Sequence, residues 1–312
     1  MKQTFLLLVI LFVFKNAYSQ HDTEPKSLVF GGAGALGITY IEAVKLAKIN
    51  PANIQDYCGT SSGSIMAAGM SMQSIEVLQK SIRDFDFKQC KQLKNLNLLD
   101  NGIYSNDGIG VLLEKIGIEA NMDFEQHFEL TQKNLYIVAT LRRKGKEDST
   151  FVFSRLTTPF IKIHDAIKAS TAIEYYFEPL FFRDSTFSQI TTKPTDFKLL
   201  DGNITNNYAF DVLLERGVAA TDIVGFYVET TKPFSRLKGL LALIADLKGR
   251  KTDKRVKTKI RNCNFLDHTI FIPSMGEKAT IHTISPKTMK RFEKIAFKGV
   301  FQNNLDKYMD SR

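Results

Sequence analysis

The chain has 312 residues, 44% of them hydrophobic and 24% charged, so it is long enough for one large domain or two small ones and is not disordered, collagen-like or coiled-coil in composition. Three cysteines exclude a disulfide-built scaffold, and the lack of any run of 18 apolar residues excludes a polytopic membrane protein. The net charge of +9 lies in residues 231–262, which hold eleven Lys and Arg against two Asp, so a local basic patch is indicated.

The N-terminus has the pattern of a secretory signal peptide. An apolar run at residues 5–14 follows a basic start, and Ala17 and Ser19 are small residues that fit cleavage after Ser19. Ten apolar residues are too few to cross about 30 Å of hydrocarbon. We therefore exclude residues 1–19 from the fold and expect an exported protein, periplasmic or secreted, with an N-terminal membrane anchor as the alternative.

Strand-like and helix-like patterns alternate along the rest of the chain. In chain order we expect a strand at 27–30, a helix at 38–49, a strand at 54–58, two helices within 64–83, a helix at 109–116, strands at 134–140 and 149–154, a helix at 164–169, a strand at 197–200, a helix at 211–216, a strand at 223–228 and a long helix at 285–308. Ser74 is the expected N-cap between the paired helices, and Asn106 with Asp107 the expected cap of the next one.

This alternation favours an α/β sheet covered by helices on both faces. No repeat and no convincing linker divides the chain. We therefore predict one domain at 20–312, with its motifs in a core at about 27–230 and a helical part at about 231–312.

Glycines dominate the segment between the first strand and the first helix, residues 31–37 (GGAGALG). Such a loop turns backbone N–H groups outward at a helix N-terminus, where they stabilise negative charge. Gly32, Gly34 and Gly37 also fit the dinucleotide fingerprint G-x-G-x-x-G, and Asp56 follows Gly37 by 19 residues. Because Asp56 falls inside the second predicted strand and the fingerprint alone is weak, we do not assign a dinucleotide site.

A second glycine-flanked motif follows the next strand. Residues 59–63 (GTSSG) form a G-x-S-x-G sequence between the strand at 54–58 and a helix rich in small residues. This is the setting of a nucleophile elbow, with Ser61 at its tip. A serine nucleophile needs an adjacent base and placed donors for the oxyanion that its attack creates. The glycine loop one strand earlier is the candidate for those donors.

The glycine loop, the GTSSG elbow and a later Asp201-Gly202 at a strand end together resemble the patatin-like phospholipases. The resemblance covers about residues 27–230, and weaker similarity lies at 102–104 (GIY), 135–140 (LYIVAT) and 165–170 (DAIKAS). It implies a three-layer α/β/α fold with a mostly parallel central sheet. It also implies a lipid acyl hydrolase, of phospholipase A or lipase type, that acts on phospholipid or another acyl-ester lipid.

Site residues follow from the same resemblance. It implies a Ser–Asp dyad in which Ser61 is the nucleophile and Asp201 is the base that takes its proton and returns it to the leaving group. The backbone N–H groups of Gly32, Ala33 and Gly34 would form the oxyanion hole. The glycines that support these turns are Gly37, Gly59, Gly63 and Gly202.

Three residues depart from the usual family pattern. Ala33 stands at the middle position of the usual Gly-Gly-Gly, and Leu36 stands where the loop usually has a basic residue before the last glycine. In both respects the loop resembles that of the animal patatin-like lipases, which tolerate a non-glycine in the middle and a leucine before the last glycine. Asn203 follows the Asp-Gly pair in place of Gly or Ala. Ala33 matters only if its φ must be positive, and Asn tolerates a left-handed backbone.

A conventional α/β-hydrolase is the first alternative. Its triad runs Ser, Asp, His along the chain, and Ser61 and Asp201 followed by His268 or His282 satisfy that order. His164 precedes the aspartate and fits less well. A second alternative is a lipid-binding protein that kept the fold but lost catalysis.

The basic segment has two interpretations. Leucines and isoleucine recur at helical spacing over 237–247, before the Lys/Arg run at 248–261. They predict either a core-facing helix with a solvated basic tail or an interfacial patch on anionic membrane, where each basic residue contributes about 1 kcal/mol. Nucleic acid is not expected as a partner, because the run lacks interleaved aromatic residues.

No cofactor or metal is expected. The five His and three Cys show no ligand spacing, so we predict a metal-independent hydrolase. The sequence leaves open the lipid head group, the acyl position and the chain length.

Overall fold

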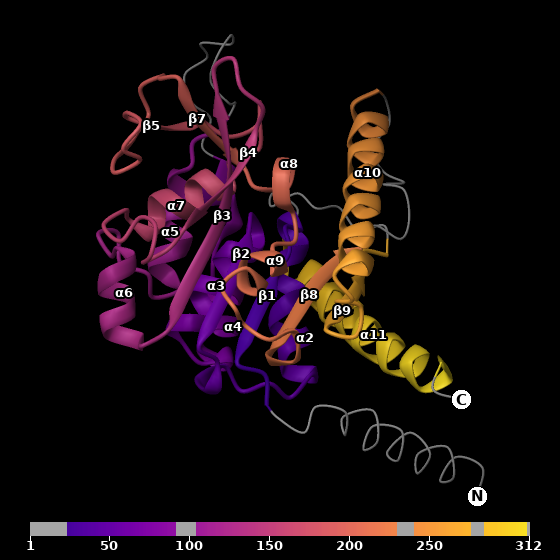
Figure 1. Cartoon of the computed structure of the whole chain (residues 1–312). Coiled ribbons are helices and arrows are strands. Elements are labelled where there is room, and N and C mark those ends of the chain that lie inside the picture. The colour runs from indigo at the N-terminus through magenta and orange to yellow at the C-terminus, as the bar shows by residue number, and fades with distance from the viewer. Residues whose placement is uncertain (1–23, 92–103, 230–239, 276–283, 311–312) are drawn as a thin grey trace, which may run out of the picture.

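The computed structural model describes residues 24–91, 104–229, 240–275 and 284–310 (Figure 1). The predicted signal peptide and His282 lie outside these residues. Among the described residues, no helix is both long and apolar enough to cross a membrane.

A mixed sheet forms the centre of the described chain. Its parallel part has the order β3-β2-β1-β8-β9, while β7, β5 and β6 extend it beyond β3 as antiparallel strands and β4 also pairs with β3. The strands are β1 (Ser27–Phe30), β2 (Asp56–Thr60), β3 (Asn134–Arg143), β4 (Ser149–Phe153), β5 (Leu180–Phe182), β6 (Ile190–Thr191), β7 (Phe197–Asp201), β8 (Ile223–Glu229) and β9 (Thr269–Pro273).

Helices surround this sheet. The α-helices are α2 (Thr39–Leu46), α3 (Ser62–Met72), α4 (Ile75–Arg83), α5 (Asp107–Lys115), α6 (Phe124–Thr131), α7 (Ile163–Ser170), α8 (Asn203–Asn206), α9 (Phe210–Leu214), α10 (Leu240–Asn262) and α11 (Pro286–Asp310). Short 3-10 helices are η1 (Gly34–Ile38), η2 (Pro51–Asn53), η3 (Phe87–Lys91) and η4 (Ala220–Asp222).

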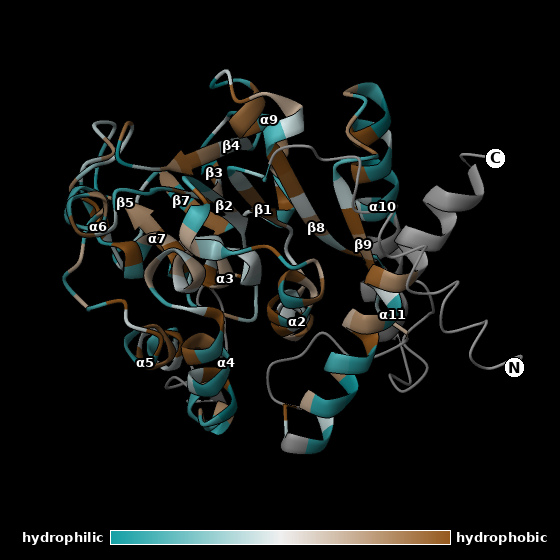
Figure 2. Ribbon diagram, turned by 90° about the horizontal axis from the view of Figure 1, so that it is seen from below, coloured by the Kyte–Doolittle hydropathy of each residue, from teal (hydrophilic) through white to brown (hydrophobic). Residues whose placement is uncertain are grey.

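The alternation of side chains along β1 divides the interior into two cores. Leu28 and Phe30 face the larger core, which α2, α3, α4, α5, α7 and α11 cover. Val29 faces the opposite core, which contains residues of α9 and α10. Figure 2 shows this layering, with α2, α3, α4 and α5 on one side of the sheet and α9 on the other. Both faces of the sheet are therefore buried, as parallel strands require, and the predicted three-layer α/β/α fold is confirmed.

Most predicted elements are present with shifted ends. The second strand was expected to stop at Gly59, but β2 runs through that glycine to Thr60. Ser74 caps α4 by accepting a hydrogen bond from the Val77 N–H, as predicted. Asn106 occupies the N-cap of α5 but makes no capping bond: its Nδ2 donates to the Glu178 carbonyl, and its Oδ1, which would have to accept, has no partner among the described residues.

Several elements were not predicted, namely α6, α8, β5, β6 and β9. The part of the chain beyond residue 230 was expected to be helical, yet it contributes β9 to the sheet. The strands β5 and β6 are too short to show a periodicity.

The pairing register brings two strand ends together at one edge of the sheet. Thr60, the last residue of β2, pairs with Val138 of β3, so the next residue, Ser61, lies level with Ala139. On the other side of β3, Asp201 at the end of antiparallel β7 pairs with Ala139. Ser61 and Asp201 thus flank the same residue of β3.

Candidate active site

Ser61 lies at a sharp turn between β2 and α3. Its φ of 53° and ψ of −128° form a conformation that residues other than glycine rarely adopt. The Ser61 N–H donates to Ser170 Oγ at 2.8 Å, and that hydroxyl donates to the Val138 carbonyl at 2.6 Å. The strained turn is therefore held by α7 and β3, which come from distant parts of the chain.

Glycines let the backbone pack closely around this turn. A Cβ at Gly63 would overlap the Phe30 carbonyl oxygen, and a Cβ at Gly202 would overlap the Val138 carbonyl oxygen. Gly202 has a φ of −61°, so lack of space, not a left-handed backbone, requires glycine there. The same lack of space holds at the other predicted support glycines, Gly37 and Gly59.

The Asp201 carboxylate faces the Ser61 hydroxyl and is buried. Its Oδ2 accepts a hydrogen bond from Ser61 Oγ at 2.8 Å, and its Oδ1 accepts one from the Asn203 N–H at 2.8 Å. The Asp201 backbone is fixed by its N–H to the Ala172 carbonyl at 3.0 Å and by the Thr140 hydroxyl, which donates to its carbonyl at 2.9 Å. Burial raises the pKa of Asp201 to about 6, although the bonds from Asn203 and Ser61 act in the opposite direction.

Asn203 fits this turn without strain. It is the first residue of α8 and is not among the described residues with positive φ. Its departure from the family pattern therefore needs no left-handed backbone, and its N–H is one of the two donors to the buried carboxylate.

Two N–H groups of the glycine loop are bonded within the protein. The Gly32 N–H donates to the Asn207 carbonyl at 3.0 Å, and the Ala33 N–H donates to Ser62 Oγ at 3.0 Å. Ala33 has a φ of −144°, so the alanine is accommodated without strain. These two of the three predicted oxyanion donors already have acceptors.

The next two N–H groups open a helix. Gly34, with a φ of 54°, is the first residue of η1, and the Leu36 N–H makes the first bond of that turn, to the Ala33 carbonyl at 3.1 Å. The N–H groups of Gly34 and Ala35 precede that bond and have no acceptor within the helix. Leu36, in place of the usual basic residue, is buried in the core.

A cavity of about 70 Å³ opens beside Ser61. Gly34, Ala35 and Ser62 line it next to the serine, and the rest of its wall is mainly apolar. The apolar lining consists of Ile38, Ile65, Met66, Ile82, Phe87, Ile109, Leu112, Ile173, Phe177 and Ile284. The site thus joins a buried serine–carboxylate pair, helix-start N–H groups and an apolar space.

A family model described as patatin-like phospholipase matches residues 28–214. The match covers more than half of the chain and takes in the glycine loop, the Ser61 turn and Asp201. The chain belongs to the patatin-like phospholipase family. This membership supports lipid acyl hydrolysis as its class of activity.

Two viral proteins and one solved structure are similar to this chain. The protein named "Probable lipid hydrolase 463L", from Invertebrate iridescent virus 6, is 27% identical over 217 residues, which are 65% of this chain and 68% of the viral protein. "Uncharacterized protein R571" of Acanthamoeba polyphaga mimivirus is 26% identical over 211 residues, 64% of this chain and 66% of the viral protein. The crystal structure of VipD from Legionella pneumophila shares the fold, with a TM-score of 0.57 and 15% identity over 91% of this chain and 67% of VipD.

The described histidines lie away from the serine of this patatin-like site. His268 directly precedes β9, an edge strand that β8 and β1 separate from β2. At about 4.8 Å per strand, this is a lateral distance of about 14 Å from the strand that leads to Ser61. His164 Nε2 lies 2.9 Å from the Ile118 carbonyl. The structure therefore does not bring either histidine to Ser61, and His282 lies outside the described residues.

Two other sequence signals do not form sites in the described residues. Asp56, which fitted a dinucleotide fingerprint, accepts hydrogen bonds from Ser27 Oγ and Asn134 Nδ2, both at 2.9 Å, at the amino end of β2. That end of the strand is opposite the glycine loop. Within the described part of the chain, no three His, Cys, Asp or Glu side chains gather as a metal site would require.

The basic segment is part of α10, and the described side chains begin at Lys251. Val256 and Ile260 are buried against the sheet, so this stretch is more than a solvated tail. Lys257 pairs with Glu229, and Lys259 pairs with Asp211. The remaining described cations are Lys251, Lys254, Arg255 and Arg261, all exposed.

Sequence reasoning missed three residues that shape this site. Ser170 lies in the segment that resembles the family, but no role was assigned to it. Asn207 holds the glycine loop through its carbonyl, and Arg255 reaches the turn after Asp201 from α10. Each acts across 50 or more residues of sequence, so no local pattern marks them.

Proposed function

We propose that this patatin-like protein is a lipid acyl hydrolase that works through a Ser61 acyl-enzyme, with Asp201 as general base. The observation that carries the proposal is the 2.8 Å hydrogen bond from the Ser61 hydroxyl to the buried Asp201 carboxylate, beside an apolar cavity. A carboxylate works well as a base when its pKa lies near the operating pH, and burial raises the pKa of Asp201 to about 6.

The proposed reaction has two stages, acylation of Ser61 and hydrolysis of the acyl-enzyme. Ser61 Oγ attacks the ester carbonyl carbon while its proton passes to Asp201 Oδ2. The tetrahedral intermediate collapses, the C–O bond to the alcohol breaks, and Asp201 returns the proton to the leaving oxygen. Water then attacks the acyl-enzyme, giving its proton to Asp201, and the fatty acid leaves as Ser61 regains a proton.

The donors of the oxyanion hole are proposed from the loop at 31–34 and the start of η1. The N–H of Gly34, which was predicted for this role, and the N–H of Ala35 have no acceptor in their helix, and both residues line the cavity. The Ser62 N–H, directly after the nucleophile, is the usual second donor of a nucleophile elbow. Gly32 and Ala33 would have to leave their present acceptors to take part.

The cavity indicates how the acyl chain binds. Its lining is mainly apolar, as expected for a fatty-acyl group. It offers an apolar place for the part of the acyl chain nearest the ester.

The test is acyl-ester hydrolysis by the purified protein without added metal. Ser61→Ala and Asp201→Asn should each abolish activity, while the double variant His268→Ala/His282→Ala should keep it. Loss in the histidine variant, with its circular dichroism unchanged, would favour a Ser-His-Asp triad. Lack of activity on short esters, long esters and phospholipid vesicles alike would indicate the lipid-binding protein instead.

We also propose that segment 248–261 contacts anionic membrane. Among the described residues, Lys251, Lys254 and Arg261 are exposed and have no acidic side chain paired with them. Binding to vesicles with anionic lipid should exceed binding to neutral vesicles and weaken with salt. Lys251→Gln/Lys254→Gln/Arg261→Gln should remove this difference, and equal binding of the variant and the unaltered protein to anionic vesicles would reject the contact.

Export is proposed from the N-terminal pattern alone. The expected mature chain begins at Gln20, after cleavage behind Ser19. N-terminal sequencing of the protein recovered outside the cytoplasm would test this. A chain that keeps residues 1–19 on the membrane would support the anchor instead.

A further inference from the structure

Two side chains of helix α10, Arg255 and Lys259, form hydrogen bonds with the segment directly after Asp201. Figure 1 shows α10 standing beside α8, at the sheet edge where β7 ends. Lys259 Nζ donates to Asn206 Oδ1 at 2.8 Å, to the Tyr208 carbonyl at 2.9 Å and to Asp211 Oδ1 at 2.6 Å. One turn earlier on α10, Arg255 reaches the part of the segment nearest Asp201.

Arg255 makes a two-pronged contact with backbone oxygens. One guanidinium nitrogen donates to the Asn203 carbonyl at 2.7 Å, and the other donates to the Ile204 carbonyl at 2.8 Å. The guanidinium group of arginine is planar and presents its donors in a fixed fork, whereas the donors of a lysine ammonium rotate. The contact thus fixes the orientation of the peptide units of α8, not only their distance.

One residue that Arg255 binds also contacts Asp201, the proposed base. Asn203, whose carbonyl Arg255 binds, donates its N–H to Asp201 Oδ1 at 2.8 Å, and Asp201 Oδ2 faces Ser61. We propose that Arg255 is a positioning residue that holds the α8 turn so that the Asp201 carboxylate keeps its hydrogen bond to Ser61. The role of this contact in catalysis rests on the function proposed above.

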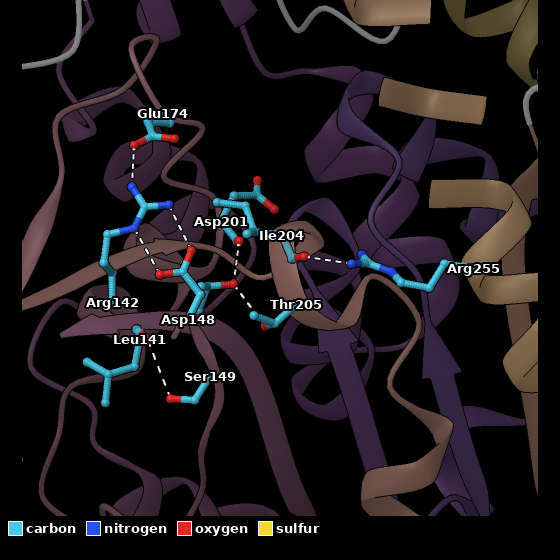
Figure 3. Close-up of polar contacts among 10 residues, drawn as sticks. Leu141, Arg142, Asp148, Ser149, Glu174, Asp201, Ile204, Thr205 and Arg255 are labelled. Atoms are coloured by element: carbon cyan, nitrogen blue, oxygen red, sulfur yellow. Dashed lines mark hydrogen bonds and ion pairs between the residues drawn. The ribbon is translucent and has the colours of Figure 1, made fainter. Parts of the chain in front are cut away.

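Charged groups on the two sides of this turn differ. Figure 3 shows Arg142, Asp148 and Glu174 on one side of Asp201 and Arg255 on the other. Arg142 pairs with Asp148 at 2.8 Å and with Glu174 at 2.6 Å, so these three charges satisfy one another. Arg255 instead donates to two backbone carbonyl oxygens, those of Asn203 and Ile204.

Removal of Arg255 should disturb the base without unfolding the segment, because Lys259 still holds its far end. The turn loosens, the Asn203 N–H moves from Asp201, and the bond that lowers the pKa of the carboxyl weakens. The acid limb of the rate profile should therefore move to higher pH. The kcat on a soluble ester should fall, by up to about 100-fold if the carboxylate is misplaced by about 1 Å.

The experiment compares Arg255→Gln with Arg255→Lys and with Arg183→Gln. Arg183 is an exposed arginine whose side chain donates to Gln189 Oε1 at 2.9 Å, so its variant matches the loss of charge and of a surface hydrogen bond. Each protein is assayed on a soluble monomeric ester, which leaves out any membrane contact of α10. We expect lower kcat, nearly unchanged KM and a shifted acid limb in Arg255→Gln, a smaller change in Arg255→Lys and no change in Arg183→Gln.

A second measurement does not depend on activity. Carbon-13 NMR of aspartate carboxyls, assigned through Asp201→Asn, gives the titration of Asp201 in each variant. A higher Asp201 midpoint in Arg255→Gln than in Arg183→Gln supports the inference, and superimposed midpoints overturn it. If Ser61→Ala keeps full activity, the proposed reaction fails, and the NMR titration still decides whether Arg255 positions Asp201.

Discussion

The two ends of helix α3 carry two buried serines, each hydrogen-bonded to a titratable side chain, and only one of these pairs forms a candidate active site. Ser61, directly before α3, bonds to Asp201 at 2.8 Å. Ser71, near the end of α3, lies 2.8 Å from His127 Nε2 of α6. By distance and burial the pairs are equivalent.

They differ in backbone, access and charge. Ser61 has a positive φ and lines a cavity, whereas Ser71 is inside a regular helix and its hydroxyl also contacts the Ala68 carbonyl at 2.7 Å. Burial, reinforced by the charge of Lys133, lowers the pKa of His127 to about 4, so the imidazole is neutral at pH 7. A serine–base hydrogen bond alone therefore does not identify a site. The strained turn, the cavity and the helix-start N–H groups must accompany it.

Removing the hydroxyl of Ser61 or of Ser71 tests the difference between the two pairs most directly. Ser61→Ala should lower kcat/KM for an acyl ester by at least about 1,000-fold, since the proposed nucleophile is lost. Ser71→Ala should leave kcat/KM within about twofold, because Ser71 does not contact the cavity. Steady-state hydrolysis by the two variants checks this. A large loss in Ser71→Ala with an unchanged fold would mean that the two pairs are coupled.

The pH dependence of kcat/KM should also distinguish the Ser61–Asp201 pair from the Ser71–His127 pair. Asp201 must be ionised to act as base, and its pKa lies at about 6. We therefore expect kcat/KM to level off above that pH and to fall about tenfold per unit below it. His127→Gln should leave this acid limb in place, and a limb that shifts with His127 would contradict the assignment.

The parts of this site that sequence could predict are those set by local backbone demands. The strand–turn–helix at Ser61 and the Asp201-Gly202 pair need glycine where a Cβ would overlap a carbonyl oxygen. Because the required glycines are close to the functional residue in the chain, they leave a short motif in the sequence. Contacts that cross the fold leave none. Ser170 meets the Ser61 turn across 109 residues, and His127 meets Ser71 across 56.

The same distinction holds for the secondary structure. The parallel strands β1, β2, β3 and β8 are apolar runs and were predicted, whereas the short strands β5 and β6 and the edge strand β9 take their structure from their neighbours. For α6 a local signal was present: Asp123 and Gln126 form a capping box at its start. Its apolar face is short, with Phe124 as the one buried apolar residue among its described positions, so periodicity alone did not reveal it.

Stability should respond to pH with opposite sign at the two pairs. The folded-state pKa of Asp201 is raised from about 3.8, so its ionisation costs native stability as pH rises from about 4 to 6. Asp201→Asn should therefore raise the free energy of unfolding above pH 6, by up to about 3 kcal/mol for a shift of about two units. No such gain should occur at pH 4. Urea unfolding at pH 4.5 and 7.5 measures the difference.

The His127 effect runs the other way. Its folded-state pKa is lowered from 6.5, so the cost of keeping it neutral is absent above pH 6.5 and grows as pH falls toward 4. His127→Gln should reduce the loss of unfolding free energy between pH 6.5 and pH 4. This change in slope is separate from any constant loss of stability through poorer packing of the glutamine. Parallel pH slopes for His127→Gln and the unaltered protein would show that His127 is not the group responsible.

The smallest expected effect concerns the Ser71 hydroxyl itself. Ser71→Ala removes the hydrogen-bond partner of a buried imidazole nitrogen and should destabilise the fold by about 1–3 kcal/mol at pH 7. Ser61→Ala removes one of the two donors to a buried carboxylate that is ionised at pH 7, and a lost hydrogen bond to a charged group costs more, so its effect on stability at pH 7 should be at least as large. Thermal unfolding of the two variants side by side tests this ordering. A smaller loss of stability in Ser61→Ala than in Ser71→Ala would contradict it.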